Sequence, residues 1–269
     1  MPHDVTGAGE APRLLVTVAH PDDETFGCGS LLLHAGAAGA VTCVLCATRG
    51  DAGQPAPGSG VRPEQLAAVR ERELREAAAL LGVSRVELLG FADSGMAGDA
   101  DEGTLVGEPL DSVRDQVRAC IEDFRPHVLV TLDGGDGHRD HERIRDATLA
   151  AAEVADWPVQ RVYLHCFPRS LLQRWLEHMA QHNPSSEHLE AQVGGTPEEL
   201  ITTVIDTARH LPARERAMAA HVSQVSPFEG LPPDLRMEFL TAERLQRVIP
   251  AWTGGPREHD VFAAPASRP

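Results

Sequence analysis

The sequence LLVTVAHPDDETFGCG at residues 14–29 decides the fold. Residues 14–19 are apolar or favour β-structure, and the polar run HPDDE at residues 20–24 follows without a break. An uninterrupted apolar run of this length indicates a strand buried on both faces, as in a parallel α/β sheet. Ligands of such sheets bind beyond the carboxyl ends of the strands, so we expect HPDDE to lie at a functional edge.

Two interpretations of HPDDE differ in whether a cation is present. One imidazole and three carboxylates at a strand end repel one another unless a positive charge lies between them, and a divalent metal ion supplies that charge. Alternatively, Pro21 begins a helix, and Asp22 and Asp23 only complement its dipole. His20 and a second polar cluster further along the chain favour the metal.

The second cluster is DGGDGHRDH at residues 133–141, which follows the apolar run 128–132. A single histidine at a helix start is usually structural. Here His138 and His141 are three residues apart, so their side chains can project toward one point. Asp140 lies between them and can orient an imidazole. The coincidence of a strand end, a glycine-rich approach and two histidines favours a functional site.

The rest of the chain alternates between strand and helix patterns. We expect strands at 14–19, 41–47, 86–89, 128–132 and 161–167, and helices at 25–39, 63–81, 111–124, 140–154, 171–182 and 212–222. This alternation predicts a Rossmann-like three-layer α/β/α fold with a mostly parallel sheet of order 3-2-1-4-5 and extra C-terminal elements, of which 200–207 is strand-like. We expect one domain over 13–253, with flexible tails at 1–12 and 254–269.

The predicted strand order makes the first and fourth strands neighbours, so the two polar clusters face each other. We therefore expect His20, Asp23 and His141 to converge on one metal ion. Two imidazoles and one carboxylate leave a fourth tetrahedral position open, which is typical of hydrolytic zinc, with Fe²⁺ as the alternative metal. Zinc lowers the pKa of a bound water from ~16 to ~7.

The remaining polar side chains of the clusters suit hydrolysis of an amide or ester. Asp22 is next to a ligand and is the natural base for the bound water. His138 is then free to act as an imidazolium that stabilises the oxyanion and helps to protonate the leaving amine. Asp140 is expected to keep that imidazolium charged through a hydrogen bond.

Composition narrows the choice of partner. The formal net charge of −16 opposes binding to a nucleic-acid backbone or an anionic membrane surface, so we expect a small-molecule substrate. Five cysteines in apolar stretches indicate reduced thiols, and the absence of a leader or a spanning apolar run completes the expectation of a soluble, cytoplasmic protein. Cys43 and Cys46 lie on one strand and point to opposite faces, so they do not share a metal. The composition is compatible with a homo-oligomer as well as with a monomer.

AHPDDE at 19–24 together with GHRDH at 137–141 resembles the LmbE-like/PIG-L family of zinc-dependent N-deacetylases, which act mostly on N-acetylglucosamine-type conjugates. Further motifs match in family order: TRGDAG at 48–53, LLGV at 80–83, DSGM at 93–96 and AHVSQ at 220–224. DSGMAG resembles the branch that contains the mycothiol-pathway deacetylase and the mycothiol S-conjugate amidase. The resemblance implies metal on His20, Asp23 and His141, base Asp22, oxyanion partner His138, and a substrate pocket lined by Arg70, Asp93 and Met96.

Three observations qualify this interpretation. Arg70 and Glu73 lie three residues apart, and outside the resemblance a solvated ion pair is the more common meaning of that spacing. Arg139 replaces the proline of the common GHPDH motif, which should leave the ligands intact. Asp136 stands where the mycothiol deacetylase pattern has an aromatic residue, and a carboxylate at the pocket rim favours a hydroxyl-rich or cationic ligand over a stacked one.

The leading hypothesis is a zinc-dependent deacetylase that removes the N-acetyl group of an amino sugar or its conjugate. One alternative is an amidase that cleaves a larger acyl or cysteinyl amide, and the depth of the acyl pocket distinguishes the two. A second alternative is a metal-holding or nucleotide-holding module without turnover, against which a free base and a second histidine argue.

Overall fold

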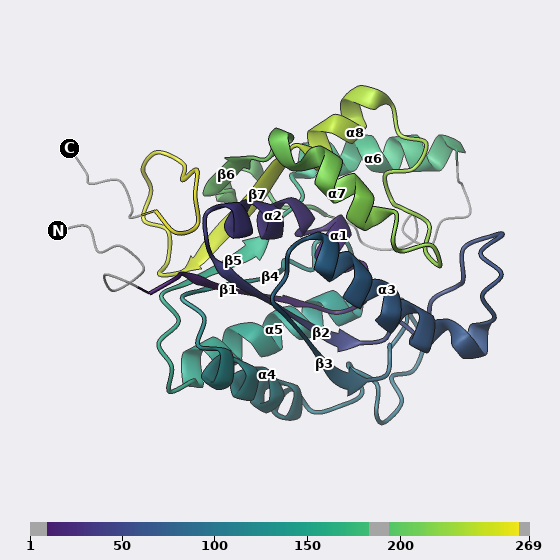
Figure 1. Ribbon diagram of the computed structural model, residues 1–269, viewed down its shortest axis with the longest axis horizontal. Helices are drawn as coiled ribbons and strands as arrows, with labels where there is room; N and C mark the ends of the chain where they lie inside the picture. Colours follow the sequence, from purple (N-terminus) through teal and green to yellow (C-terminus); the bar gives the residue numbers. More distant parts are fainter. Residues whose placement is uncertain (1–9, 183–193, 264–269) are drawn as a thin grey trace.

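The computed structural model describes residues 10–182 and 194–263. A seven-stranded sheet lies between two layers of helices (Figure 1). The strands are β1 (Arg13–Val18), β2 (Val41–Thr48), β3 (Arg85–Phe91), β4 (Val128–Leu132), β5 (Arg161–His165), β6 (Thr203–Asp206) and β7 (Ala242–Ile249). The α-helices are α1 (Asp23–Phe26), α2 (Gly29–Ala37), α3 (Leu66–Leu80), α4 (Leu110–Phe124), α5 (Arg139–Val154), α6 (Arg169–His182), α7 (Leu211–Met218) and α8 (Pro233–Leu240).

The strand order is β3-β2-β1-β4-β5-β7-β6. The first five strands pair in parallel, which confirms the predicted order 3-2-1-4-5. The extra C-terminal elements continue the sheet, because β7 pairs antiparallel with both β5 and β6. Since β1 and β4 are neighbours, the polar clusters that follow them lie side by side.

Strand β1 is buried on both faces, as the apolar run predicts. Leu14, Val16 and Val18 point into a core shared with α2 and α3, whereas Leu15 and Ala19 point into a core shared with α4 and α5. Helices α4 and α5 cover the lower face of the sheet in Figure 1, and α1, α2, α3 and α7 cover the upper one. A third, aromatic core lies between α6 and α8.

Two element predictions need correction. The helix expected at 25–39 is interrupted between α1 and α2, where Gly27 and Cys28 stand. Strand β7 was not expected, because its inward positions include Glu243 and Arg247 as well as Leu245. Buried charges hide the alternation of apolar and polar residues by which a strand is recognised.

The segment 254–263 is packed against the body, so the flexible tail expected there is wrong for these residues. Val261 is fully buried, and the Glu258 amide donates to the Thr202 carbonyl at 2.9 Å. Glu258 also forms an ion pair with the buried Arg247 of β7 and so balances the charge of that side chain. The remaining parts of both predicted tails, 1–9 and 264–269, lie outside the described residues.

The five cysteines are buried and free, and Cys43 and Cys46 contribute to different cores, as expected for opposite faces of a strand. Within residues 10–182 and 194–263, no helix combines the length and the apolar character that a membrane crossing needs.

Candidate active site

The turn between β1 and α1 presents the first set of functional side chains. Asp23 closes this turn, because its Oδ2 accepts hydrogen bonds from the amides of Ala19 (3.2 Å) and His20 (2.8 Å). Asp22 has a φ of 123°, a conformation that costs free energy for a residue with a side chain. The turn therefore fixes His20, Asp22 and Asp23 at the edge of the sheet.

His20, Asp23 and His141 converge as the two motifs predict. His20 Nδ1 lies 3.3 Å from His141 Nε2, and the Asp23 carboxylate lies 3.4 Å from His141 Nε2 and 3.6 Å from His20 Nδ1. Ligand bonds of about 2.0–2.2 Å place the ligands of a tetrahedral ion about 3.3–3.6 Å apart. Each of the three distances lies in this range, although Asp23 approaches His141 through Oδ1 and His20 through Oδ2. The donor set suits Zn²⁺ or Fe²⁺.

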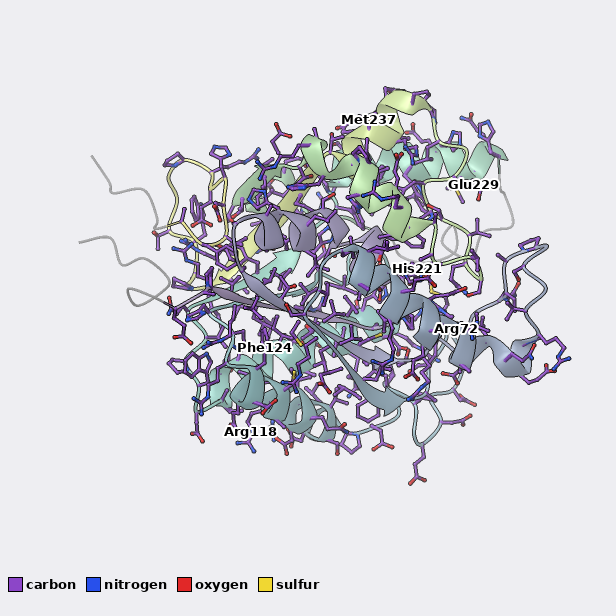
Figure 2. All side chains as sticks on the ribbon, viewed as in Figure 1. Arg72, Arg118, Phe124, His221, Glu229 and Met237 are labelled. Carbon is purple, nitrogen blue, oxygen red and sulfur yellow. The ribbon has the colours of Figure 1, made fainter. Side chains whose placement is uncertain are left out.

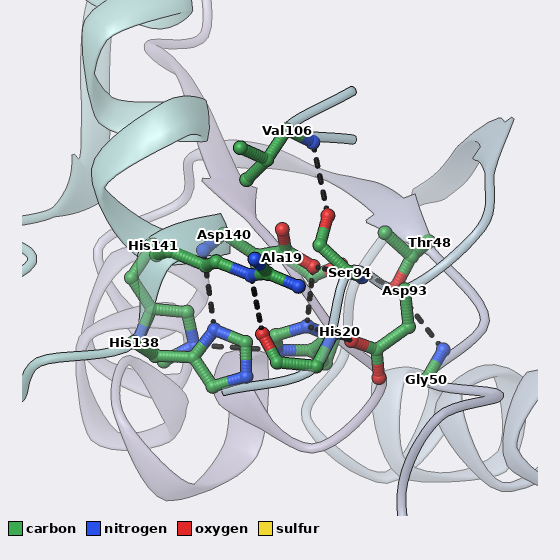
Figure 3. Close-up of polar contacts among 12 residues, drawn as sticks. Ala19, His20, Thr48, Gly50, Asp93, Ser94, Val106, His138, Asp140 and His141 are labelled. Carbon is green, nitrogen blue, oxygen red and sulfur yellow. Dashed lines mark hydrogen bonds and ion pairs between the residues drawn. The ribbon is translucent and has the colours of Figure 1, made fainter. Parts of the chain in front are cut away.

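A carboxylate orients each of the two histidines. His20 Nε2 lies 3.2 Å from Asp140 Oδ2, and His141 Nδ1 lies 2.6 Å from Asp136 Oδ2 (Figure 3 shows the His20 contact). Histidine ligands of metals commonly bond a carboxylate through the second ring nitrogen, which leaves the first one aimed at the ion. His20 Nδ1 and His141 Nε2, which face Asp23, are therefore the nitrogens available to bind a metal ion.

Among the described residues, two groups of donor atoms lie within 4.8 Å of one another, and neither includes Asp23: one is His20, His138 and His141, and the other is His20, Asp93 and Asp140. We favour the group with Asp23. In the group with Asp140, His20 Nε2 is already hydrogen-bonded to that carboxylate. In the group with His138, the ring of His138 is stacked on His141, with centroids 4.9 Å apart.

Asp140 and Asp136 have different contacts from those expected. The Asp140 carboxylate bonds His20 and the Ser94 amide (3.0 Å), and only its backbone amide contacts His138, at 3.1 Å. Asp136 lines the pocket, but its carboxylate is held by His141 and is not free at the rim. Sequence reasoning missed both partnerships because each joins residues that only the folded turns bring together.

The pKa values of His141 and His138 are shifted in opposite directions. Burial lowers the pKa of His141, but the carboxylates of Asp136 and Asp23 raise it to about 10. Burial and the neighbouring His20 and His141 lower the pKa of His138 to about 3. This opposes the imidazolium expected at His138. Because its Nδ1 accepts the Asp140 amide, the proton of the neutral ring lies on Nε2.

Arg70 forms an ion pair with Asp22, the candidate base. Its Nη2 lies 3.0 Å from Asp22 Oδ2 and donates to the Pro21 carbonyl at 2.6 Å, while Nη1 donates to the Gly50 carbonyl at 2.9 Å. Burial raises the pKa of Asp22 to about 6 against the opposing charge of Arg70. A carboxylate with this pKa is suited to accept a proton near neutral pH.

The solvated Arg70–Glu73 ion pair is wrong, because both side chains are buried and contact different partners. Glu73 accepts hydrogen bonds from the amide (2.9 Å) and the hydroxyl (2.6 Å) of Ser223. One helix, α3, thereby binds the turn after β1 through Arg70 and the AHVSQ segment through Glu73.

AHVSQ also contacts the turn through a buried ion pair. His221 Nε2 lies 2.9 Å from Glu24 Oε1, and Glu24 Oε2 accepts the Asp22 amide at 2.8 Å. His221 and Glu24 are fully buried, and His221 lies where the end of α7 approaches α1 and α3 (Figure 2). Sequence reasoning identified AHVSQ only as a motif, without this contact.

One cavity of about 360 Å³ is lined by the three candidate ligands together with Asp22 and His138. Arg70, Asp93 and Met96 line it together with His20 and His141, where the resemblance places them. Asp93 also lies 3.5 Å from His20 Nε2. A cavity of this size is in the range of pockets that hold small organic ligands.

Solved structures share the fold. GalB, the 4-carboxy-2-hydroxymuconate hydratase of Pseudomonas putida KT2440, aligns with a TM-score of 0.62 and 16% identity over 91% of this chain and 99% of its own. A deacetylase of the teicoplanin biosynthesis pathway aligns with a TM-score of 0.62 and 19% identity over 87% of this chain and 97% of its own. Since these two proteins differ in activity, the fold alone does not identify the reaction.

Sequence comparison is more specific. A 1D-myo-inositol 2-acetamido-2-deoxy-α-D-glucopyranoside deacetylase of Saccharopolyspora erythraea is 35% identical over 239 residues, which cover 80% of this chain and 78% of the relative. The family described as PIG-L, GlcNAc-PI de-N-acetylase, matches residues 15–152, which include both polar clusters and just over half of the chain. The predicted resemblance is confirmed, and the chain belongs to the PIG-L family of de-N-acetylases.

Proposed function

We propose that this protein is a metal-dependent hydrolase that removes the N-acetyl group of an N-acetylglucosamine-type conjugate. The observation that carries the proposal is the convergence of His20, Asp23 and His141 with Asp22 beside them and not needed as a ligand. The relatives support the substrate class, since the one cited above is named for an acetamido sugar. Zn²⁺ is the proposed metal, with Fe²⁺ as the alternative, and the five buried free thiols support a cytoplasmic location.

Each side chain has a defined task in this reaction. A metal held by His20, Asp23 and His141 would polarise the amide carbonyl and acidify a neighbouring water. Asp22 accepts the proton of the attacking water and returns it to the leaving nitrogen. His138 donates its Nε2 proton in a hydrogen bond to the carbonyl oxygen as negative charge develops there.

The substitution Asp22→Asn tests the proposal. We expect acetate release from N-acetylglucosaminides to fall by about 10²–10⁴-fold, because the base is lost, while the zinc content stays unchanged. Asp115→Asn, on the outer face of α4, is the matched control and should keep full activity. Failure of the zinc-loaded protein to release acetate from any of a panel of acetylated amino sugars would contradict the proposal, as would full activity of the Asp22→Asn variant.

The two alternative functions make different predictions. A module without turnover requires zinc-loaded protein that binds a sugar conjugate but releases no acid. An amidase for larger acyl groups requires a pocket that extends beyond one methyl group on the acyl side.

A further inference from the structure

The active-site cavity has two chemically different halves. On one side of the candidate metal ligands, Arg70, Asp93 and Gln224 contribute polar groups, with Met96 as the apolar exception. The other half is built mainly from large apolar side chains, with His165 beside Phe167 as a polar member. Its main members are Phe26, Phe167, Leu172, Trp175, Phe228 and Phe239.

The order of the strands separates these halves. Arg70 belongs to α3, which follows β2, and Asp93 follows β3, so the polar half lies over the β2 and β3 side of the sheet. Phe167 follows β5 and Leu172 lies on α6, so the apolar half lies over the opposite side. The candidate metal ligands follow β1 and β4, the two strands between these sides. An amide at the metal therefore has one half of the cavity on each side.

The six apolar residues named above pack into one continuous surface of the cavity, which we call the wall. Phe228 and Phe239 are 3% and 5% exposed and lie 5.5 Å apart between ring centroids, and Phe167 lies 5.6 Å from Phe239. The Trp175 indole donates to the Pro227 carbonyl at 2.9 Å, which joins α6 to the loop after α7. Rings held in this way form a preformed apolar surface larger than a single methyl group needs.

We propose that this wall binds the acyl group, and that the enzyme hydrolyses N-acyl amino sugars whose acyl chain is longer than acetyl. This inference rests on the proposed function. The hydroxyl groups of a sugar lose water on binding and need hydrogen-bond partners, which the polar half offers. The acyl chain then extends over the wall. None of the six wall residues carries a carboxylate for an ammonium group, so the chain is an uncharged alkyl or aryl group and not an aminoacyl group.

The test is an acyl series on one sugar. The zinc-loaded enzyme is assayed with methyl glucosaminides that carry N-acetyl, N-butanoyl, N-hexanoyl and N-benzoyl groups. Burial of one methylene is worth ~0.8 kcal/mol, which is about fourfold in kcat/KM, so we expect about a 15-fold gain from acetyl to butanoyl. A parallel series keeps N-acetyl and lengthens the alkyl group at the anomeric oxygen, and it should show no comparable gain.

Each outcome has one meaning. A flat or falling kcat/KM along the acyl series, with normal acetate release, overturns the inference and leaves the deacetylase function intact. A gain only in the anomeric series also overturns it, because the wall then takes the aglycone. Failure of every substrate to release acid contradicts the proposed function itself. As a readout besides turnover, hexanoate should inhibit at lower concentration than acetate, and equal inhibition would argue against an acyl site.

Two exposed valines provide a matched pair of variants. Val225 is 57% exposed and lines the cavity beside the wall, whereas Val222 is 64% exposed and does not line it. Val225→Asp should reduce the ratio of hexanoyl to acetyl turnover, because the charge opposes an apolar chain nearby. Val222→Asp should leave the ratio unchanged. Equal ratios in both variants and the parent would count against the wall as the acyl site.

Discussion

His141 shows at the scale of one residue how carboxylates prepare a metal ligand. Asp136 accepts from its Nδ1 at 2.6 Å, and Asp23 lies 3.4 Å from its Nε2. The first contact fixes the ring and the second lies on the side of the candidate ion. We therefore expect Asp136 to contribute to metal affinity without being a ligand itself.

Asp136→Asn should weaken zinc binding by about 10–100-fold, because the amide orients His141 without a negative charge. A competition titration with a zinc chelator measures the affinity. Asp146→Asn, at an exposed ion pair on the same helix α5, should leave the affinity unchanged. Equal affinities in the parent and the Asp136→Asn variant would show that His141 does not need this carboxylate.

The convergence of His20, Asp23 and His141 could be predicted from sequence because each lies in a short motif at the end of a recognisable apolar strand. The partners of those ligands could not. Asp140 was expected to orient His138 but orients His20, which lies 120 residues earlier in the chain. The identity of such a partner depends on the geometry of two turns, which the residue types alone do not specify.

The AHVSQ segment after α7 illustrates the scale of the element. It connects to the turn after β1 through His221 and Glu24 and to α3 through Ser223 and Glu73. Both contacts join segments more than 100 residues apart. The turn that carries Asp22 is therefore held in place by an element that comes from the far end of the sequence.

The His221–Glu24 pair predicts a dependence of stability on pH. Burial lowers the pKa of His221, but the charge and hydrogen bond of Glu24 raise it above its ordinary value. A raised pKa in the folded state means that the stabilising contribution is complete below the unfolded pKa of about 6.5. It is lost as the pH rises through the folded pKa.

The free energy of unfolding of His221→Gln, measured by denaturant titration from pH 5.5 to pH 9, checks this. Below pH 6.5 we expect the variant to be less stable than the parent by about 1.5–3 kcal/mol, the range for a hydrogen bond to a charged group. The difference should shrink at alkaline pH. His182→Gln, on the exposed end of α6, is the control and should show no such trend. A difference that is constant over the range would exclude a charged His221.

Elements with a clear apolar pattern were predictable, whereas α8 and β7 near the C-terminus were not. The five parallel strands contain unbroken or nearly unbroken apolar runs. Strand β7 instead buries Glu243 and Arg247, whose charges are balanced by Arg214 and Glu258. The partner of a buried charge is visible only after folding, so local sequence does not reveal such a strand.

At the scale of the whole molecule, the C-terminal segment closes the far edge of the sheet. Glu258 exchanges backbone hydrogen bonds with β6 and its neighbour, since its carbonyl accepts from the Val204 amide and its amide donates to the Thr202 carbonyl, both at 2.9 Å. Val261 then packs into the core beside α2. The domain therefore extends past residue 253.

Hydrogen exchange tests this extension. The amides of Val204 and Glu258 should exchange at least about 100-fold more slowly than in an unstructured chain, because their hydrogen bonds open only with the segment. The amides of Asp99 and Ala100, in an exposed loop, should exchange quickly and serve as the internal comparison. Rapid exchange at Glu258 would show that residues 254–263 are not part of the folded domain.

The proposed function requires that the polar clusters after β1 and β4 bind one cation between them. Anomalous diffraction at the zinc absorption edge, from crystals of the zinc-loaded protein, tests this most directly. We predict one strong peak, bonded at about 2.0–2.2 Å to His20 Nδ1, an Asp23 oxygen and His141 Nε2, with Asp22 unbound. No peak between these atoms, or a peak ligated by Asp22 or by protein atoms at all four positions, would contradict the proposed hydrolase.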